Sequence, residues 1–354
     1  MSGVRASDFL GATCPIPLAD YPRVLLAHGG GGSLGQMLIE RLFGAAFANP
    51  YLEPLGDGAV VTIGSERLAF TTDTFVVKPV FFPGGDIGSL AVHGTVNDLA
   101  MCGAEPLFLS AGYLLEEGFP MADLERVVAS MASACAAVGV SVVTGDTKVV
   151  DKGKGDGIYV NTSGIGRVRD GVAVGPGRAA PGDAVIVSGP IGDHGIAVMA
   201  AREGIDFETS LVSDSAPVVA PVRALLAAVP ETHVLRDPTR GGLATALCEI
   251  AIASKVGIRI EETEVPVRAE VQGACELLGF DPLYVACEGR FLAILPGGRV
   301  DAALAAVRAQ PGGEGARRIG SVGADDPGRL VLRTRIGSHR LLERLSGEQL
   351  PRIC

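Results

Sequence analysis

The chain has 354 residues, a length that usually corresponds to two domains. Hydrophobic residues make up 47% and charged residues 20%, so the chain has enough apolar side chains for a sizeable core. The formal net charge of −10 argues against a nucleic-acid partner, which requires a basic face. The sequence shows no apolar signal segment near its start and no uncharged apolar run long enough to span a membrane. We therefore expect a cytoplasmic protein without a membrane partner.

Glycine and cysteine carry the first local information. Glycine is about twice as frequent as its usual 7%, and it is clustered at 29–32, 84–85 and 241–242. Such clusters indicate tight turns and close approach of the backbone to a ligand. The seven cysteines contain no CxxC pair, so their spacing indicates neither a disulfide framework nor a zinc site. Most lie in apolar runs, but Cys354 is the last residue and needs another explanation.

The first half of the chain alternates between helical and strand patterns. Residues 1–22 are rich in proline and small residues and are predicted to be a loose leader. The first domain then covers residues 23–175. Its predicted helices are 34–43, 89–102 and 122–138, and its predicted strands are 59–63, 67–77, 106–115, 141–144 and 157–163.

Periodicity is interrupted over residues 170–183, where glycine and proline predict a domain boundary. The second domain covers residues 176–338, and residues 339–354 are predicted to be a mobile tail. Predicted helices are 194–203, 215–228, 240–254, 268–278 and 300–309, and predicted strands are 184–188, 258–261, 283–295, 317–322 and 329–335. Both halves mix helices and strands, which indicates the α/β or α+β class.

The sequence lacks the familiar nucleotide-binding loops. Gly153-Lys154 is followed by glycine, not by the Ser or Thr of a P-loop. No GxGxxG motif follows a predicted strand with an acidic residue beyond it. If the chain binds a nucleotide, it must do so in another way.

Four aspartates near the ends of predicted elements suggest that other way: Asp57, Asp73, Asp98 and Asp146. Isolated carboxylates are costly to bury unless they are paired or bind a metal ion. Mg²⁺ with a polyphosphate is the natural partner, because Mg²⁺ takes carboxylate and phosphate oxygens together. Each aspartate by itself is equally compatible with capping a turn. The four together favour a metal site.

Several motifs together resemble one family. They are TTDTFVVKP (71–79), FFPGGDIG (81–88), GTVNDLA (94–100), GDTKV (145–149), SGPIGDHG (188–195), DPTRGGL (237–243) and the terminal PRIC (351–354). The internal motifs resemble the PurM-like superfamily of ATP-using enzymes. With the PRIC ending, the chain resembles the HypE family, the carbamoyl dehydratases of [NiFe]-hydrogenase maturation. The resemblance runs from about residue 24 to the end.

This resemblance implies a PurM-like two-domain fold with a C-terminal α/β sandwich and a flexible C-terminal tail. It implies a homodimer in which the N-terminal domains share a barrel-like sheet, with ATP between the two domains near the dimer interface. The implied partners are the carbamoyltransferase HypF, which loads Cys354, and the HypC–HypD complex, which receives cyanide.

The resemblance also assigns roles to single residues. Cys354 would carry the carbamoyl group, and Lys148 and Glu288 would handle the protons during dehydration. Mg²⁺ ligation would fall to the four aspartates named above. The predicted nucleotide and magnesium site consists of Asp57, Asp73, Lys78, Asn97, Asp98, Asp146, Thr147 and Arg240.

Elementary chemistry agrees with these roles. An amide oxygen is a poor leaving group, and transfer of the γ-phosphoryl group of ATP would let it leave as phosphate. Removal of the nitrogen protons then produces a thiocyanate on the sulfur. Mg²⁺ and a lysine are suited to neutralising the phosphate charge. Glu288 lies in an apolar segment, where desolvation would raise its basicity. The alternative for Glu288 is a buried ion pair with Arg290.

Other residues keep an alternative interpretation. Cys354 has an α-carboxylate beside its thiol, which disfavours the thiolate, so we expect an acceptor that another enzyme loads. The alternative is an exposed terminal cysteine without a role. Arg240 could meet a phosphate at a helix N-terminus or only cap that helix. His28 and His194 are predicted to be structural hydrogen-bonding residues.

One position departs from the family pattern. The family usually has Asn before the residue that matches Glu288, and here that position is Cys287. Loss of the amide would weaken a hydrogen bond to the nucleotide or to the tail. Two other functions stay open at this point: a phosphotransferase or ligase acting on a free small molecule, and a carrier without catalytic activity.

Overall fold

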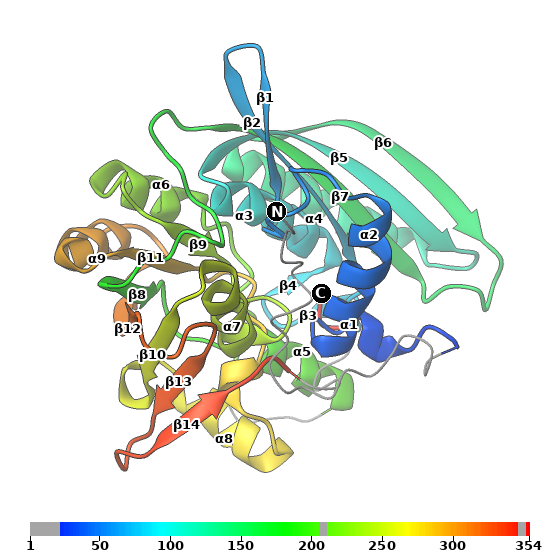
Figure 1. The fold of residues 1–354 in the computed structure, drawn as a ribbon. Coiled ribbons are helices and arrows are strands. Elements are labelled where there is room, and N and C mark those ends of the chain that lie inside the picture. The colour runs from blue at the N-terminus through cyan, green and yellow to red at the C-terminus, as the bar shows by residue number, and fades with distance from the viewer. Residues whose placement is uncertain (1–21, 205–210, 346–351) are drawn as a thin grey trace.

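The computed structural model describes residues 22–204, 211–345 and 352–354. The predicted leader therefore lies outside the described residues except for its last position. Two sheets with their helices make up the described chain, and they lie side by side (Figure 1). Within those residues, we find no helix with the length and apolar character needed to cross a bilayer.

The first sheet has five strands. In spatial order they are β1 (Ala59–Ile63), β2 (Glu66–Phe75), β7 (Ile158–Val168), β5 (Ala104–Glu116) and β6 (Ser141–Val150). All neighbouring pairs are antiparallel except β5 and β6, which run parallel. The five strands form an open sheet, so the expected barrel-like sheet would require strands from a second copy of the chain.

Two helices cover one face of this sheet, α3 (Ile87–Met101) and α4 (Met121–Val138). The α3 helix begins at Asp86, whose Oδ1 accepts hydrogen bonds from the N–H groups of Gly88 (2.7 Å) and Ser89 (3.1 Å). Nearly all of α3 is buried, because it packs on the sheet with one side and on α4 with the other. Its position brings Asp98 to the boundary between the two halves.

The second sheet has seven strands and is covered on both faces. Its order is β14 (His339–Leu342), β13 (Leu330–Arg333), β10 (Gly257–Glu261), β12 (Arg317–Gly323), β8 (Asp183–Val187), β11 (Leu292–Pro296) and β9 (Val234–Arg236). Alternate residues of the buried strand β8 face two different core clusters. One cluster contains side chains of α6 (Val219–Ala228) and α9 (Val300–Arg308), and the other contains α7 (Gly242–Ser254). This is the expected α/β sandwich.

The remaining elements are short. They are the 3-10 turns Leu26–Gly29, Glu262–Glu264, Pro282–Tyr284 and Gly297–Arg299, the helices α1 (Ser33–Leu38), α2 (Gly44–Ala46), α5 (Asp193–Glu203) and α8 (Ala269–Leu278), and the strands β3 (Phe81–Phe82) and β4 (Gly85–Asp86). A π-helical turn, Ile39–Phe43, joins α1 to α2. The predicted strand at 283–295 begins only at Leu292, because residues 285–291 form a loop that carries Glu288 into the site.

The C-terminal segment contains more structure than we expected of a tail. Residues 339–342 form β14 and pair with β13, while 346–351 lie outside the described residues. The last three residues dock against the N-terminal half. The N–H of Val76 donates to an α-carboxylate oxygen of Cys354 (3.0 Å), and the N–H of Lys78 donates to the carbonyl oxygen of Arg352 (3.2 Å).

Candidate active site

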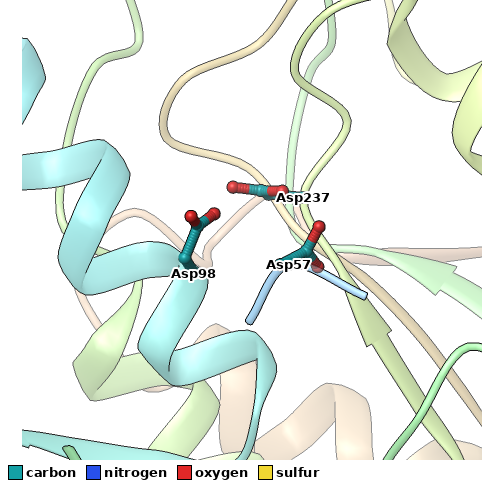
Figure 2. A group of neighbouring side chains, drawn as sticks. All are labelled: Asp57, Asp98 and Asp237. Atoms are coloured by element: carbon teal, nitrogen blue, oxygen red, sulfur yellow. The ribbon is translucent and has the colours of Figure 1, made fainter. Parts of the chain in front are cut away.

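Three aspartates gather where the two halves meet (Figure 2). Asp57 precedes β1, Asp98 lies on α3, and Asp237 follows β9. Each offers a carboxylate oxygen, and these oxygens lie within 4.8 Å of one another. We call these residues the acid cluster. Two of its members were predicted from the sequence, and both come from the first domain. The third comes from the second domain, so the site is formed by both halves of the chain.

The carboxylates of the acid cluster are strongly perturbed. Burial raises the pKa of Asp57 to about 6, although the guanidinium of Arg236 opposes this shift. Burial and the charge of Asp57 raise the pKa of Asp237 to about 8. Burial and the charges of Asp237 and Asp57 raise the pKa of Asp98 well above its ordinary value. A buried set of carboxylates that repel one another is well suited to a hard divalent cation.

Further charged and polar groups adjoin the cluster. Arg236 forms ion pairs with Asp57 (2.9 Å) and with Glu249 (3.0 Å). The hydroxyl of Thr71 donates to Asp98 Oδ2 (2.8 Å). Sequence reasoning missed Asp237 as a site residue, even though it opens the DPTRGGL motif directly after a buried strand.

Asp73 and Arg240 lie next to each other beside the cluster. Burial raises the pKa of Asp73, and the charge of Arg240 partly offsets this shift. Arg240 comes just before α7 and approaches the glycine-rich segment 29–32. Gly31 has a φ of 71°, and a Cβ there would come within 2.7 Å of the Cβ of Arg240. This close approach explains why glycine is needed at that position.

Glu288 is buried in the same region. Its backbone N–H donates to Asp214 Oδ1 (3.1 Å), and its carbonyl oxygen accepts from Asn97 Nδ2 (3.3 Å). Its Oε1 has no hydrogen-bond partner among the described residues. Burial raises the pKa of Glu288 well above its ordinary value, and the charges of Asp237 and Asp73 add to this effect. These properties match a proton acceptor held away from water.

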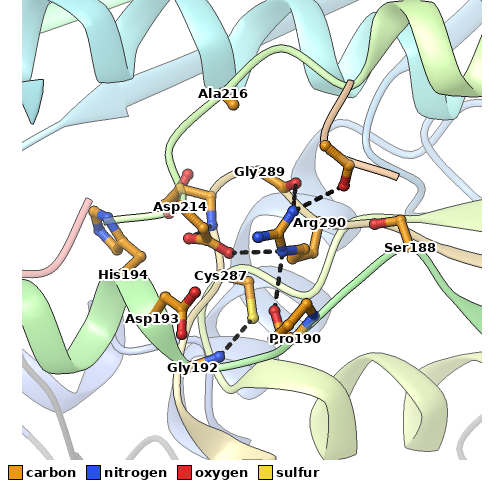
Figure 3. Close-up of polar contacts among 12 residues, drawn as sticks. Ser188, Pro190, Gly192, Asp193, His194, Asp214, Ala216, Cys287, Gly289 and Arg290 are labelled. Atoms are coloured by element: carbon orange, nitrogen blue, oxygen red, sulfur yellow. Dashed lines mark hydrogen bonds and ion pairs between the residues drawn. The ribbon is translucent and has the colours of Figure 1, made fainter. Parts of the chain in front are cut away.

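The alternative for Glu288, an ion pair with Arg290, is wrong. Arg290 faces Asp214 at 3.5 Å instead and donates to the carbonyl oxygen of Pro190 at 2.9 Å (Figure 3). The Sγ of Cys287 accepts a hydrogen bond from the N–H of Gly192 (3.2 Å; Figure 3). The effect of Cys287 on a hydrogen bond to the nucleotide or to the tail stays a prediction.

The docked tail places Cys354 in this site. The residue is only 7% exposed, which contradicts the alternative of an exposed terminal cysteine. Burial raises the pKa of its thiol to about 12; Arg240 opposes this shift, and the charges of Glu288 and Asp73 add to it. The docked thiol is therefore protonated near neutral pH. This agrees with an acceptor that is loaded elsewhere.

Two predicted residues have their polar groups engaged within the protein. Asn97 is buried, and it also donates to the carbonyl oxygen of Ala216 (3.0 Å) and accepts from the N–H of Val218 (2.8 Å). It holds the loop around Glu288 in place. Lys78 forms an ion pair with Asp156 (3.1 Å) beside the docked tail. Contacts of these two side chains with a nucleotide stay predictions.

The predicted residues of β6 lie apart from the acid cluster. The ammonium of Lys148 contacts Asp146 Oδ2 at 2.6 Å, and both side chains are about 70% exposed. Hydrogen bonds from Lys148 and from the N–H of Thr147 lower the pKa of Asp146. Within one chain, the other predicted site residues lie away from three residues of β6: Asp146, Thr147 and Lys148. The roles of these three residues stay predictions.

The histidines behave as structural hydrogen-bonding residues, as expected. The ring of His194 is fully buried and lies 2.7 Å from Ser213 Oγ and 2.9 Å from the carbonyl oxygen of Ile353. His28 accepts a hydrogen bond from the N–H of Leu25 through Nδ1 (3.0 Å).

Comparison with known proteins identifies the family. Residues 55–168 match the model of the AIR synthase related protein, N-terminal domain, and residues 180–333 match that of its C-terminal domain. The carbamoyl dehydratase HypE of Cupriavidus necator is 52% identical over 333 residues, which are 94% of this chain and 95% of that protein. The chain belongs to the HypE family.

Solved HypE structures confirm the two-domain PurM-like fold. The chain matches a HypE chain from a HypE–HypF complex with a TM-score of 0.83 and 46% identity, covering 87% of this chain and 99% of that one. It matches HypE in complex with ATP with a TM-score of 0.79 and 50% identity, covering 94% of this chain and all of that one, 100%.

Proposed function

We propose that this protein is a carbamoyl dehydratase that uses ATP to convert an S-carbamoyl group on Cys354 into a protein thiocyanate. The thiocyanate would supply cyanide to the iron centre of [NiFe]-hydrogenase. One observation carries the proposal. The terminal cysteine is buried, and the charges of Arg240 and Glu288 act on its thiol in the region of an acid cluster suited to magnesium. Relatives named carbamoyl dehydratase support the same reaction.

The acid cluster fits a magnesium–nucleotide complex. Asp57, Asp98 and Asp237 supply hard carboxylate oxygens, and Arg236 alone does not offset the burial and mutual repulsion that raise their pKa values. The structure of a relative with ATP supports the nucleotide. When bound, Mg²⁺–ATP supplies the phosphoryl group that turns the amide oxygen into a leaving group. Arg240, whose charge acts on the thiol of Cys354, would balance negative charge at that oxygen.

Glu288 is the proposed acceptor of the nitrogen proton. Its carboxylate is buried without a hydrogen-bond donor on Oε1, so a proton from the carbamoyl nitrogen would be its natural partner. Asn97 and Asp214 hold its backbone from both sides. The buried tail excludes water from the sulfur and thereby protects the carbamoyl group from hydrolysis.

A second copy of the chain would complete the site. Strand β6 is exposed along almost its whole length, and Val142, Val143 and Val149 present apolar side chains there. Such an edge strand favours pairing with another chain. A homodimer through this sheet would cover β6 and bring Asp146 and Lys148 towards the site of the other copy.

The proposed partners follow the reaction. HypF would load Cys354, and the structure of a relative in complex with HypF supports this partner. The HypC–HypD complex would receive the cyanide. The acidic composition favours the cytoplasm as the compartment.

The decisive experiment measures the mass of the C-terminal peptide. The protein is incubated with HypF, carbamoyl phosphate, ATP and Mg²⁺, in parallel with the variant Glu288→Gln. The wild-type peptide should carry a group lighter by one water than carbamoyl, and the variant should retain the carbamoyl group. An unmodified Cys354 with continued ATP consumption would indicate a free small-molecule substrate. No adduct and no ATP turnover would indicate a carrier.

A further inference from the structure

The docked tail is held through the backbone oxygens of its last three residues, of which that of Cys354 belongs to the α-carboxylate. Those of Arg352 and Cys354 accept hydrogen bonds from the backbone N–H groups of Lys78 and Val76. That of Ile353 accepts from the side chain of His194 at 2.9 Å. His194 therefore contacts the residue immediately before the cysteine that carries the chemistry.

The hydrogen bonds of His194 determine its tautomer. A carbonyl oxygen only accepts, so the Nε2 that faces Ile353 must carry the proton. The neutral ring then accepts at Nδ1, and Ser213 Oγ donates to it at 2.7 Å. The N–H of Ser215 donates in turn to Ser213 Oγ (3.0 Å). Phe82 packs edge-on against the ring at 5.4 Å and restricts its rotation.

The loop that orients His194 also holds Glu288. Ser213 contacts the histidine, and the next residue, Asp214, accepts the backbone N–H of Glu288 at 3.1 Å. Figure 3 shows Asp214 between His194 and the segment that carries Cys287 and Gly289. One short loop thus connects the tail, through His194, to the backbone of the proposed proton acceptor.

We propose that His194 is a positioning residue that locks the docked tail in a single register, with the loop 213–216 tying this register to Glu288. The inference rests on the proposed function, because register matters only for the group that Cys354 carries. A shift of one residue along an extended chain moves the sulfur by about 3.3 Å. A proton acceptor must lie within about 2.6–3.2 Å of its target, so such a shift would separate the two groups.

Alkylation of Cys354 tests the lock without HypF or ATP. A buried, protonated thiol reacts only when the tail undocks, so the rate with iodoacetamide reports the undocked population. Cleavage after Glu348 releases the peptide Gln349–Cys354 for mass measurement. His194→Phe keeps an aromatic ring but loses both ring nitrogens. It should raise the alkylation rate of Cys354 about tenfold, which corresponds to about 1.4 kcal/mol for a lost buried hydrogen bond.

Three further variants separate the lock from general destabilisation. His194→Gln keeps a donor at Nε2 and should react closer to the wild-type rate. Ser213→Ala removes the group that fixes the tautomer and should give an intermediate rate. His233→Phe is the matched control, because His233 contacts Asp183 at 2.7 Å in the C-terminal sheet, away from the tail. It should leave the alkylation of Cys354 unchanged.

The results distinguish the two proposals. Wild-type alkylation rates in both His194→Phe and Ser213→Ala would overturn the lock, as would an equal increase in His233→Phe. With HypF-loaded protein, His194→Phe should slow dehydration about tenfold without changing the KM for ATP, the cost expected for one lost positioning contact. If His194→Phe dehydrates the carbamoyl group at the wild-type rate, the proposal that the tail register is tied to Glu288 is wrong. Failure of the wild-type protein to dehydrate the carbamoyl group would reject the proposed function. The alkylation rates would still show whether His194 holds the tail in its docked position.

Discussion

The acid cluster and the β6 edge place the same kind of side chain in opposite environments. Burial raises the pKa of Asp237 to about 8, whereas Lys148 lowers that of the exposed Asp146. The positive charge of Arg236 only partly offsets this shift at Asp237, and a bound cation would offset it further. Asp146 already has a positive charge beside it, that of Lys148 on the same strand. The difference shows that a single chain already brings the carboxylates of the acid cluster together for a ligand. The side chains of β6 would be covered only by a second chain.

The largest expected effect comes from removing the sulfur of Cys354, on which the proposed roles of both the acid cluster and β6 depend. Cys354→Ser should abolish the thiocyanate adduct completely, since a carbamate on the serine oxygen cannot produce a protein thiocyanate. Stabilisation by Mg²⁺–ATP should stay, because the acid cluster is intact. The mass of the C-terminal peptide and the melting temperature with and without Mg²⁺–ATP check this prediction. Loss of both responses would mean that the cysteine contributes to the nucleotide site.

The next largest effect should come from breaking the β6 edge. Val143 is 60% exposed, and Val143→Lys would place a charge in the proposed dimer interface. We expect a folded monomer with strongly reduced dehydration. Sedimentation velocity measures the first property, and the peptide mass measures the second.

The matched control for this variant is Val128→Lys on the outer helix α4, where Val128 is 44% exposed. It should stay dimeric and active. A dimeric Val143→Lys, or a fully active monomer, would remove β6 from the proposed site.

A smaller effect is expected from weakening the acid cluster. Asp98→Asn removes one of three repelling carboxylates, so the protein without metal should become more stable. Its affinity for Mg²⁺–ATP should fall about tenfold, which reduces the stabilisation by saturating ligand by about 1.4 kcal/mol. Thermal unfolding with a ligand titration measures both changes. Unchanged affinity would exclude Asp98 as a ligand.

The smallest effect concerns pH. Asp57 and Asp237 have ordinary pKa values near 3.8 that the fold raises to about 6 and about 8. Between pH 4 and these raised values, the folded state binds more protons than the unfolded state, so stability falls as pH rises. Urea unfolding at several pH values without metal should show this decline, and saturating Mg²⁺–ATP should reduce it. Asp237→Asn should make stability fall less steeply with pH. An unchanged slope in this variant would contradict the predicted role of Asp237.

Much of the fold follows from local patterns. Helical spacing predicted helices at 122–138 and 300–309, which correspond closely to α4 and α9. β-Branched residues predicted the strand at 258–261, which corresponds to β10. The segment 283–295 was predicted less well, because its apolar residues suit a strand while its first part forms the loop around Glu288. An apolar composition indicates that a segment is buried. It does not indicate whether the buried segment is a strand or a loop.

For the site, the sequence and the family resemblance of its motifs predicted Asp57, Asp98, Glu288, Arg240 and Cys354, because motifs and the terminal cysteine can be read from residue order. Only the tertiary structure decided which of these residues meet. It added Asp237 to the acid cluster, placed Asp146 on an exposed edge, and gave His194 a contact with the tail. The reason is physical: pKa shifts, ion pairs and tail docking depend on distances between segments far apart in the chain, and residue order does not contain those distances.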